Sequence, residues 1–300
     1  MKHSLKTKVL VLTGPTASGK TGLAVALARR FAGEILSVDS RQVYKGMDLG
    51  TGKDLEQYGL VPYHLINLLD PTEEFSVSRF QTLALQTLAA LAREGALPIL
   101  CGGSGHYLKA LLQDYPFPHL AHNPHFSAAL EGWPQDTLAQ VLDQLGDPGP
   151  RDSKRRMARR IEKAKSPVPL GFQAPNFREL YLPKVFVLTP ERSWLRQRIQ
   201  IRLQERMDQG LVEEVQRLLD QGVSAERLRR FGLEYKWVLA YLEGELGLEQ
   251  MMEKLYQGIC QFAKRQETYF RFMEKEGVPL EWVAEPEGLE EKVGAWLGEE

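Results

Sequence analysis

Residues 14–21, with the sequence GPTASGKT, constrain this chain more than any other segment. They fit the pattern G-x-x-x-x-G-K-[ST] of a phosphate-binding loop, in which glycines let backbone N–H groups approach an oxyanion. The apolar run 8–12 before the loop predicts a buried strand, and residues 22–29 after it predict a helix. Because the motif requires this strand–loop–helix order, the sequence predicts a site for a di- or triphosphate. The alternative is a glycine-rich turn without a ligand.

The loop motif also assigns chemistry to individual side chains. The ammonium group of Lys20 supplies positive charge, and the hydroxyl of Thr21 is placed to bind Mg²⁺. The start of the following helix adds a partial positive charge from its unpaired N–H groups. The residues predicted to bind phosphate are Gly14, Thr16, Ala17, Ser18, Gly19, Lys20 and Thr21.

The composition is that of a globular protein that can bury a sizeable core, because 43% of the 300 residues are hydrophobic. No apolar run reaches the roughly 18 residues that a membrane span needs. The N-terminus runs directly into the first predicted strand and leaves no room for a signal peptide. Two cysteines are too few for a disulfide framework or a cysteine-based metal site, so we expect a cytoplasmic protein. The net charge of −1 argues against a generally basic surface but not against a local basic patch.

The first third of the chain alternates predicted strands and helices. Strands are predicted at 34–38 and 97–101, with an amphipathic helix at 80–93 between them. Such alternation is typical of an α/β fold, here a P-loop NTPase-like parallel sheet flanked by helices. Loops at the carboxyl ends of parallel strands meet at one edge of the sheet. We therefore expect the phosphate loop and the loops after these two strands to converge.

The character of the sequence changes after residue 114. Prolines interrupt short helical pieces up to Gly171, which indicates an inserted module. A strand pattern at 184–188 is suited to rejoin the sheet, and long helices follow it. We predict a P-loop core of residues 1–114 and 180–300 and an inserted, all-helical module of residues 115–179.

Asp39 directly follows the predicted strand at 34–38, at the edge of the sheet where the phosphate site is expected. A carboxylate in that position can be a magnesium ligand or a general base. It can equally be an N-cap or turn residue. The residue pattern alone leaves these roles open.

Three further sets of residues combine positive charge with a helical spacing. In the inserted module, the arginines at 155, 156, 159 and 160 share one face of a predicted helix, which suits a phosphodiester backbone. Residues 264–271 mix basic with aromatic side chains, which can stack on bases. The alternatives are a solvated helix face and an amphipathic helix that packs its aromatic side chains inward. Arg198, Arg202 and Arg206 repeat every four residues and could bring one guanidinium to the phosphate site.

His119, His122 and His125 are spaced three residues apart. A zinc site there lacks an obvious fourth ligand, and Pro124 interrupts any helix through it, so we do not expect one.

In combination these motifs resemble the bacterial tRNA dimethylallyltransferases, the IPP transferase family. The resemblance is carried by the phosphate loop, by SVDSRQVYKGMDLGTGK at 37–53 and by GGSGHYLKAL at 102–111. It continues through RRMAR at 155–159 and AKRQETY at 263–269. The segments occur in the family's order over nearly the whole chain, so their combination is far more specific than the loop alone.

The resemblance implies a prenyl transfer to RNA. A dimethylallyl group would pass from dimethylallyl diphosphate to N6 of the adenosine that adjoins the anticodon on its 3′ side in tRNA. Diphosphate would leave with the help of Mg²⁺. The resemblance also implies a monomer, in which the inserted module grips the anticodon stem of the tRNA.

Family roles carry over to the matching residues. Asp39 matches the family's proposed general base, and Thr21 and Arg202 match further catalytic residues, with Arg202 also contacting the diphosphate. The residues that the resemblance assigns to tRNA are Asp39, Ser40, Arg41, Gln42, Ser104, Arg155, Arg156, Met157, Ala158, Arg159, Lys264, Arg265, Gln266 and Arg271.

Some positions depart from the family's usual residues. Ser104 replaces a threonine, Ser127 replaces an arginine, and residues 232–234 replace Gly-Tyr-Lys or Gly-Tyr-Arg. The segment before Arg155 is also shorter than usual, so we expect the inserted module to bind the tRNA differently from other family members.

Two rival functions are consistent with the phosphate loop. One is a small-molecule kinase that uses ATP, against which the basic segments and the insertion argue. The other is a non-catalytic RNA-binding P-loop protein, against which the intact Lys20, Thr21 and Asp39 argue.

Overall fold

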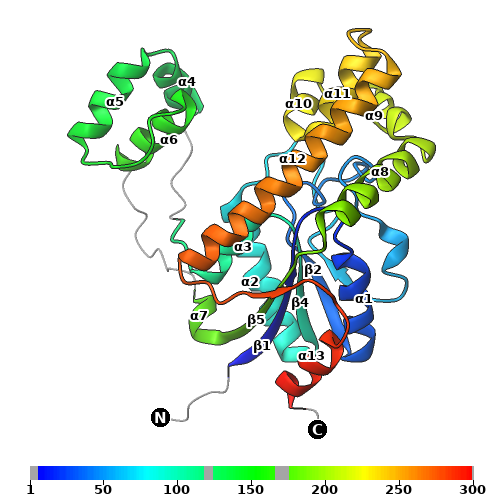
Figure 1. Ribbon diagram of the computed structural model, residues 1–300. Helices are drawn as coiled ribbons and strands as arrows, with labels where there is room; N and C mark the ends of the chain where they lie inside the picture. Colours follow the sequence, from blue (N-terminus) through cyan, green and yellow to red (C-terminus); the bar gives the residue numbers. More distant parts are fainter. Residues whose placement is uncertain (1–5, 118–123, 166–175, 299–300) are drawn as a thin grey trace. The chain divides into compact units, whose positions relative to one another are not determined.

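The computed structural model describes residues 6–117, 124–165 and 176–298 (Figure 1). The chain divides into two compact units, which we describe separately. One consists of Met1–Asp114 and Asn176–Glu300, and the other of Tyr115–Pro175.

The larger unit is built on a six-stranded sheet with the order β3-β2-β4-β1-β5-β6. Every neighbouring pair of strands is parallel, as the alternation in the sequence predicted. The predicted strand at 184–188 does rejoin the sheet, beside β1, with Val11 opposite Val185. The strands are β1 (Thr7–Thr13), β2 (Gly33–Ser37), β3 (Tyr63–His64), β4 (Leu97–Gly102), β5 (Tyr181–Leu188) and β6 (Glu281–Val283).

Helices cover both faces of the sheet, which explains the continuous apolar runs of its central strands. Successive side chains of β1 point to opposite faces. Val9 and Val11 pack into one core with α2 (Val77–Glu94), α3 (Gly105–Leu112) and the end of α12 (Leu248–Lys275). Leu10 and Leu12 pack into a second core with α1 and α13. The fold is therefore a three-layer α/β/α arrangement, and the P-loop-type parallel sheet flanked by helices is confirmed.

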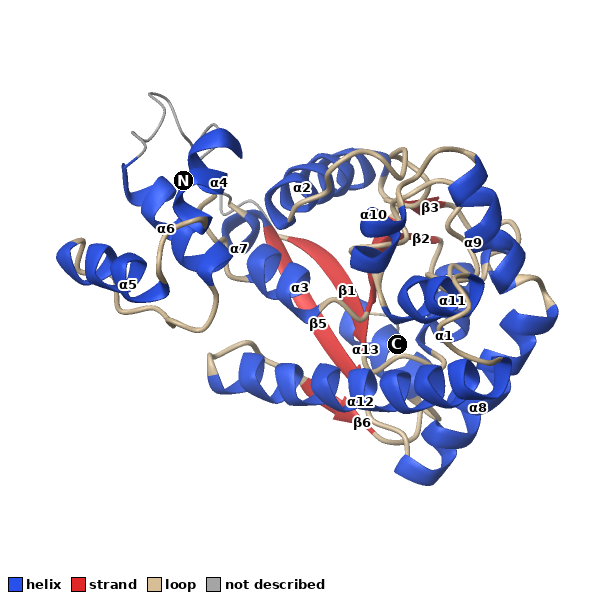
Figure 2. Ribbon diagram, turned by 90° about the horizontal axis from the view of Figure 1, so that it is seen from above, coloured by secondary structure: helices blue, strands red, loops and turns tan. Residues whose placement is uncertain are grey.

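A third core lies at the carboxyl ends of the strands. Figures 1 and 2 show α8 and α12 side by side, with α9–α11 grouped near one end of α12. Their apolar side chains enclose Val43, Tyr44 and Met47 from the loop that follows β2. These helices thereby form a wall around the loops at this edge of the sheet. The remaining helices of this unit are α1 (Lys20–Arg30), α7 (Phe177–Leu180), α8 (Arg192–Asp208), α9 (Leu211–Asp220), α10 (Ala225–Phe231), α11 (Leu233–Leu242) and α13 (Leu289–Leu297), with a short 3-10 turn at Leu55–Gln57.

The smaller unit consists of helices in its described part. These are α4 (Pro124–Glu131), α5 (Gln135–Gln144) and α6 (Lys154–Lys165). They enclose a small core of six buried residues: Leu130, Leu138, Leu142, Met157, Ala158 and Ile161.

The second boundary of the inserted module differs by four residues from the sequence prediction, which placed it after residue 179. The helix α7 belongs to the sheet unit. Phe177 is fully buried in the core beside α3, and the carboxylate of Asp114 accepts hydrogen bonds from the backbone N–H groups of Phe177 (2.7 Å) and Arg178 (3.0 Å). These contacts hold residues 114 and 177 together at the base of the module.

Within the described part of the chain, no helix is both long enough and apolar enough to cross a membrane.

Candidate active site

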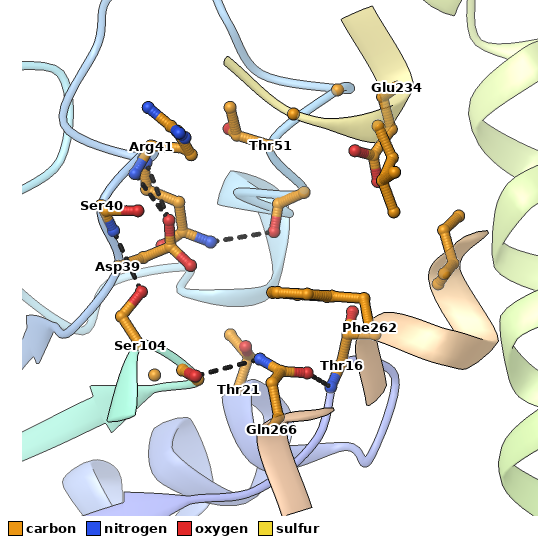
Figure 3. Close-up of a pocket in the computed structure, with 18 of the residues that line it drawn as sticks. Thr16, Thr21, Asp39, Ser40, Arg41, Thr51, Ser104, Glu234, Phe262 and Gln266 are labelled. Carbon is orange, nitrogen blue, oxygen red and sulfur yellow. Dashed lines mark hydrogen bonds between the residues drawn. The ribbon is translucent and has the colours of Figure 1, made fainter. Parts of the chain in front are cut away.

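A cavity of about 270 Å³ lies at the carboxyl ends of β1, β2 and β4 (Figure 3). The phosphate loop and the loops after β2 and β4 meet there, as the sequence predicted. Two arginines of α8, the turn between α10 and α11, and the middle of α12 complete its lining.

The phosphate loop has the backbone that its glycines allow. Gly14 has a φ of 152°, and a Cβ at this position would lie 2.8 Å from the backbone oxygen of Leu188. Gly19 has a φ of 82° and precedes α1, so the first N–H groups of that helix face the loop. The hydroxyl of Ser18 is buried and has no hydrogen-bond partner among the residues that the structure describes. A buried group of this kind is expected where a ligand supplies the partner.

The ammonium group of Lys20 lies in the same loop and donates to the backbone oxygen of Pro15 (3.0 Å). Burial lowers its pKa, and the nearby charge of Arg202 lowers it further, while Cys101 and Asp39 act in the opposite direction. An anion in the cavity favours the charged form of Lys20. The charge balance therefore suits a phosphate ligand.

Asp39 stabilises a turn with one carboxylate oxygen, and its other oxygen can take part in chemistry. Its Oδ1 atom accepts hydrogen bonds from the backbone N–H groups of Arg41 (2.7 Å) and Gln42 (3.3 Å), and neither bond uses Oδ2. Burial raises the pKa of Asp39, against the lowering effect of these hydrogen bonds and of the charges on Lys20 and Arg41. A partly buried carboxylate with a raised pKa, whose second oxygen makes no hydrogen bond within the described residues, is suited to accept a proton at the cavity.

Two of the three regularly spaced arginines of α8 line the cavity, Arg202 and Arg206. Arg202 is hydrogen-bonded to the carboxylate of Asp54 and to the backbone oxygen of Gly52 (3.3 Å). Burial and the neighbouring charge of Arg206 lower the pKa of Arg202 to about 10. Arg198 does not line the cavity; it is exposed and lies over the ring of Trp194.

Glu234 also lines the cavity, and the sequence analysis gave it no role. Its carboxylate lies 3.8 Å from the guanidinium of Arg206, and burial raises its pKa. The only signal in the sequence was its departure from the family's usual basic residue. In this chain the carboxylate partly balances the charges of Arg202 and Arg206.

One wall of the cavity is apolar, with side chains from Phe231, Leu233, Ile259 and Phe262. They come from α10, α11 and α12, which are distant in the sequence from the phosphate loop. Such a wall suits a small hydrocarbon group beside the phosphate site.

Comparison with known proteins places the chain in a family. Residues 42–273 match the family model described as IPP transferase. The tRNA dimethylallyltransferase 2 of Syntrophotalea carbinolica is 46% identical over 282 residues, which cover 92% of this chain and 93% of that protein. The chain belongs to the IPP transferase family.

Further comparisons agree with this membership. The tRNA dimethylallyltransferase 1 of Geotalea daltonii is 44% identical to this IPP transferase over 92% of its chain and 90% of the relative. The crystal structure of the tRNA isopentenylpyrophosphate transferase of Bacillus halodurans matches with a TM-score of 0.72 at 31% identity, over 98% of this chain and 96% of that one. The resemblance seen in the sequence is confirmed, and the protein is an enzyme of the transferase class. Neither the comparisons nor the cavity favours a kinase or a non-catalytic protein.

The residues of this IPP transferase that the resemblance assigned to tRNA differ from one another in burial and in hydrogen bonding. Ser40 and Ser104 line the cavity, and the backbone N–H of Ser40 donates to Oγ of Ser104 (3.2 Å). The guanidinium of Arg41 lies over the ring of Phe231 and donates to the backbone oxygen of Arg230 (3.0 Å). Like the two serines, Arg41 lines the cavity.

Gln42 and Gln266 line the cavity, but their amide groups are engaged within the protein. The amide of Gln42 accepts from Oγ of Ser37 (2.7 Å) and donates to the backbone oxygen of Gly52 (3.1 Å). Gln266 is buried against the phosphate loop. The expectation that Gln266 contacts tRNA directly does not fit this arrangement, because α12 turns it inward while Lys264, Arg265 and Arg271 are exposed.

The basic helix α6 also shows two kinds of position. Arg155 and Arg156 are exposed, and Arg156 pairs with Asp152 (3.0 Å). Arg159 is half-buried and pairs with Glu162 of the same helix. Met157 and Ala158 are fully buried in the core of the module, so the expectation that their side chains contact tRNA does not fit this structure.

Thr21 lines the cavity next to Lys20, at the start of α1. A hydroxyl is a hard oxygen ligand of the kind that Mg²⁺ takes together with water and substrate phosphates. The Thr21 hydroxyl of this IPP transferase therefore fits the chemistry of a magnesium ligand. Of the three histidines considered as a zinc site, His119 and His122 lie outside the described residues. In the part that is described, no three His, Cys, Asp or Glu side chains are grouped to hold a metal ion.

Proposed function

We propose that this IPP transferase moves a dimethylallyl group from dimethylallyl diphosphate to N6 of the adenosine 3′-adjacent to the anticodon in tRNA. The observation that carries the proposal is a single cavity. It joins the phosphate loop and two arginines to the free oxygen of Asp39 and to an apolar wall.

The donor binds with its diphosphate in the phosphate loop. Backbone N–H groups, the hydroxyl of Ser18 and the charges of Lys20 and Arg202 hold the phosphate oxygens. Arg202 shares its hydrogen bonds between Asp54 and the ligand. The dimethylallyl group then lies against the apolar wall, which excludes water from its reactive carbon.

The acceptor adenine reaches the cavity as an unstacked base, since its amino group is not accessible within a stacked loop. Its N6 nitrogen attacks the first carbon of the dimethylallyl group, and the bond between that carbon and the diphosphate oxygen breaks. The diphosphate leaves with the bonding electrons, and Oδ2 of Asp39 takes the proton that N6 loses.

Charge is the main quantity that the site has to stabilise in this step. Negative charge grows on the departing diphosphate, and Lys20 and Arg202 lie where they stabilise it. A magnesium ion held by Thr21 and the diphosphate supplies additional charge neutralisation when bound. We expect the enzyme to act as a monomer in the cytoplasm.

The test uses the full-length protein with dimethylallyl diphosphate, Mg²⁺ and an anticodon stem-loop RNA. We expect an RNA product that is heavier by one dimethylallyl group in mass spectrometry. The matched control is the same stem-loop with guanosine at the target position, which should stay unmodified. Phosphate transfer from ATP without any prenylated RNA would overturn the proposal.

A further inference from the structure

Gln266 occupies an unusual place for a polar side chain on a long surface helix. It lies on α12, and only 8% of it is exposed. Its Oε1 atom accepts from the backbone N–H of Thr16 in the phosphate loop (2.8 Å), and its Nε2 donates to the backbone oxygen of Gly103 after β4 (3.0 Å). Figure 3 shows this amide bridging the two loops.

The backbone of the loop after β4 packs closely against the amide of Gln266. A Cβ on Gly103 would clash with Nε2 of Gln266, so the loop after β4 approaches the amide because glycine stands there. Both loops line the cavity. A buried amide is unfavourable unless it is hydrogen-bonded, and here both ends of the group are satisfied.

A second link continues from this loop to Asp39. Oγ of Ser104 accepts from the backbone N–H of Ser40, the residue next to Asp39 (3.2 Å). The backbone N–H of Ser104 donates to the oxygen of Val38, on the other side of Asp39 (3.2 Å). The phosphate loop, Gln266, residues 103–104 and the loop of Asp39 therefore form one chain of hydrogen bonds.

We propose that Gln266 is a positioning residue that sets the distance between the phosphate loop and Asp39. The inference rests on the proposed function, in which the leaving diphosphate and the proton acceptor lie on either side of the reacting carbon. Both ends of the Gln266 amide are bonded to the backbone of the two loops, so its role is to hold the loops and not to bind the ligand. Its loss lets the two loops separate, and misplacement of reacting groups lowers the rate of the chemical step more than it lowers binding.

The first experiment compares Gln266→Met with the wild type in steady-state and single-turnover transfer to the stem-loop. Methionine keeps the length of the side chain but cannot bridge the loops. We expect kcat to fall by about 10- to 100-fold, with the KM values for RNA and donor changed by less than about 3-fold. The matched control is Gln257→Met, which removes an exposed hydrogen bond to Glu253 on the same helix and should leave kcat unchanged.

The second experiment is a double-mutant cycle with Ser104→Ala, which removes the acceptor for the N–H of Ser40. If both residues belong to one chain of hydrogen bonds, the fold-decrease of kcat in the double variant is clearly smaller than the product of the fold-decreases in the two single variants. Multiplicative losses, or a Gln266→Met enzyme with the wild-type kcat, would overturn the inference.

Two controls keep the result interpretable. If Gln266→Met fails to fold, as judged by circular dichroism, Gln266→Glu replaces it. Glutamate keeps the acceptor for Thr16 and loses the donor to Gly103, and we expect the same fall in kcat. If the wild type itself transfers no dimethylallyl group, the proposed function fails; if the wild type is active and neither variant is slowed, only the role of Gln266 fails.

Discussion

Asp39 shows how one side chain can serve the backbone and the chemistry together. The hydrogen bonds from Arg41 and Gln42 converge on Oδ1 and fix the turn, so Oδ2 keeps a defined direction. Burial raises the pKa of the carboxyl group, which makes it a better proton acceptor once it is ionised. The turn and base roles, which the sequence left as alternatives, are therefore compatible.

The raised pKa of Asp39 predicts the pH dependence of the reaction. A general base works only when deprotonated, so kcat/KM should be constant at higher pH and fall as the pH drops through the pKa of Asp39 in the free enzyme. Because that pKa is raised, the acid limb should lie above 3.8, the ordinary value for an aspartate. A pH series of kcat/KM measures it.

The matched variant is Asp39→Asn, whose Oδ1 can still accept both hydrogen bonds of the turn. We expect RNA affinity within about 2-fold of the wild type and a loss of turnover on the order of 10²- to 10⁴-fold, as is typical for removal of a general base. An Asn variant with wild-type turnover would show that Asp39 is not the base.

The loop between β2 and α2 is held by a buried carboxylate on α9. Glu214 is 1% exposed and accepts hydrogen bonds from the backbone N–H groups of Asp48 (2.8 Å), Leu49 (2.7 Å) and Gly50 (3.0 Å) and from the hydroxyl of Tyr235 (2.8 Å). The next residues of the loop line the cavity. The hydrogen bonds of Glu214 therefore connect the packing of the C-terminal helices to the shape of the cavity.

Replacement of Glu214 by alanine should destabilise the protein strongly. Three backbone N–H groups and a buried hydroxyl lose their partner, and unsatisfied buried groups cost about 1–3 kcal/mol each when water cannot replace the partner. Water that enters the space left by the side chain replaces part of these hydrogen bonds, so we expect the free energy of unfolding in urea to fall by at least about 3 kcal/mol. The exposed neighbour Glu213→Ala should change it by less than about 0.5 kcal/mol. Equal stabilities of the two variants would contradict the role of Glu214.

At the level of the complete chain, the two units have separate cores, and the chain leaves and re-enters the larger unit at neighbouring points. Asp114 is hydrogen-bonded to the backbone of Phe177 and Arg178, so the two ends of the sheet unit lie next to each other. The phosphate loop, Asp39, both cavity arginines and Gln266 all belong to the larger unit.

A chain in which a short Gly-Ser linker replaces residues 115–175 should therefore fold and bind inorganic diphosphate like the full protein. We expect its affinity for the stem-loop to fall by at least about 10-fold. The plot of log affinity against log salt should also flatten, by about 0.7–0.9 for each phosphate contact that the module makes. Calorimetry and filter binding measure the two properties. Unchanged RNA affinity and an unchanged salt slope would show that the module does not contact RNA. Loss of diphosphate binding would show that the larger unit does not fold without the module.

Features that depend on neighbouring residues could be predicted from the sequence alone. The apolar run, glycines, lysine and helix of residues 7–30 form one local unit, so the phosphate loop and its strand could be read directly. The strands at 34–38, 97–101 and 184–188 were found in the same way, because burial on both faces demands continuous apolar runs. β3 and β6 were missed, since two or three residues carry no period.

Which distant residues complete the site became known from the folded chain. Gln266 meets Thr16 across 250 positions of sequence, and Arg202 meets Asp54 across 148. The family resemblance assigned Gln266 and the buried Met157 and Ala158 of α6 to RNA because they lie within segments that match the family's tRNA-contacting motifs. Which face of a helix turns inward depends on what packs against it, and that is a property of the folded chain rather than of a local pattern.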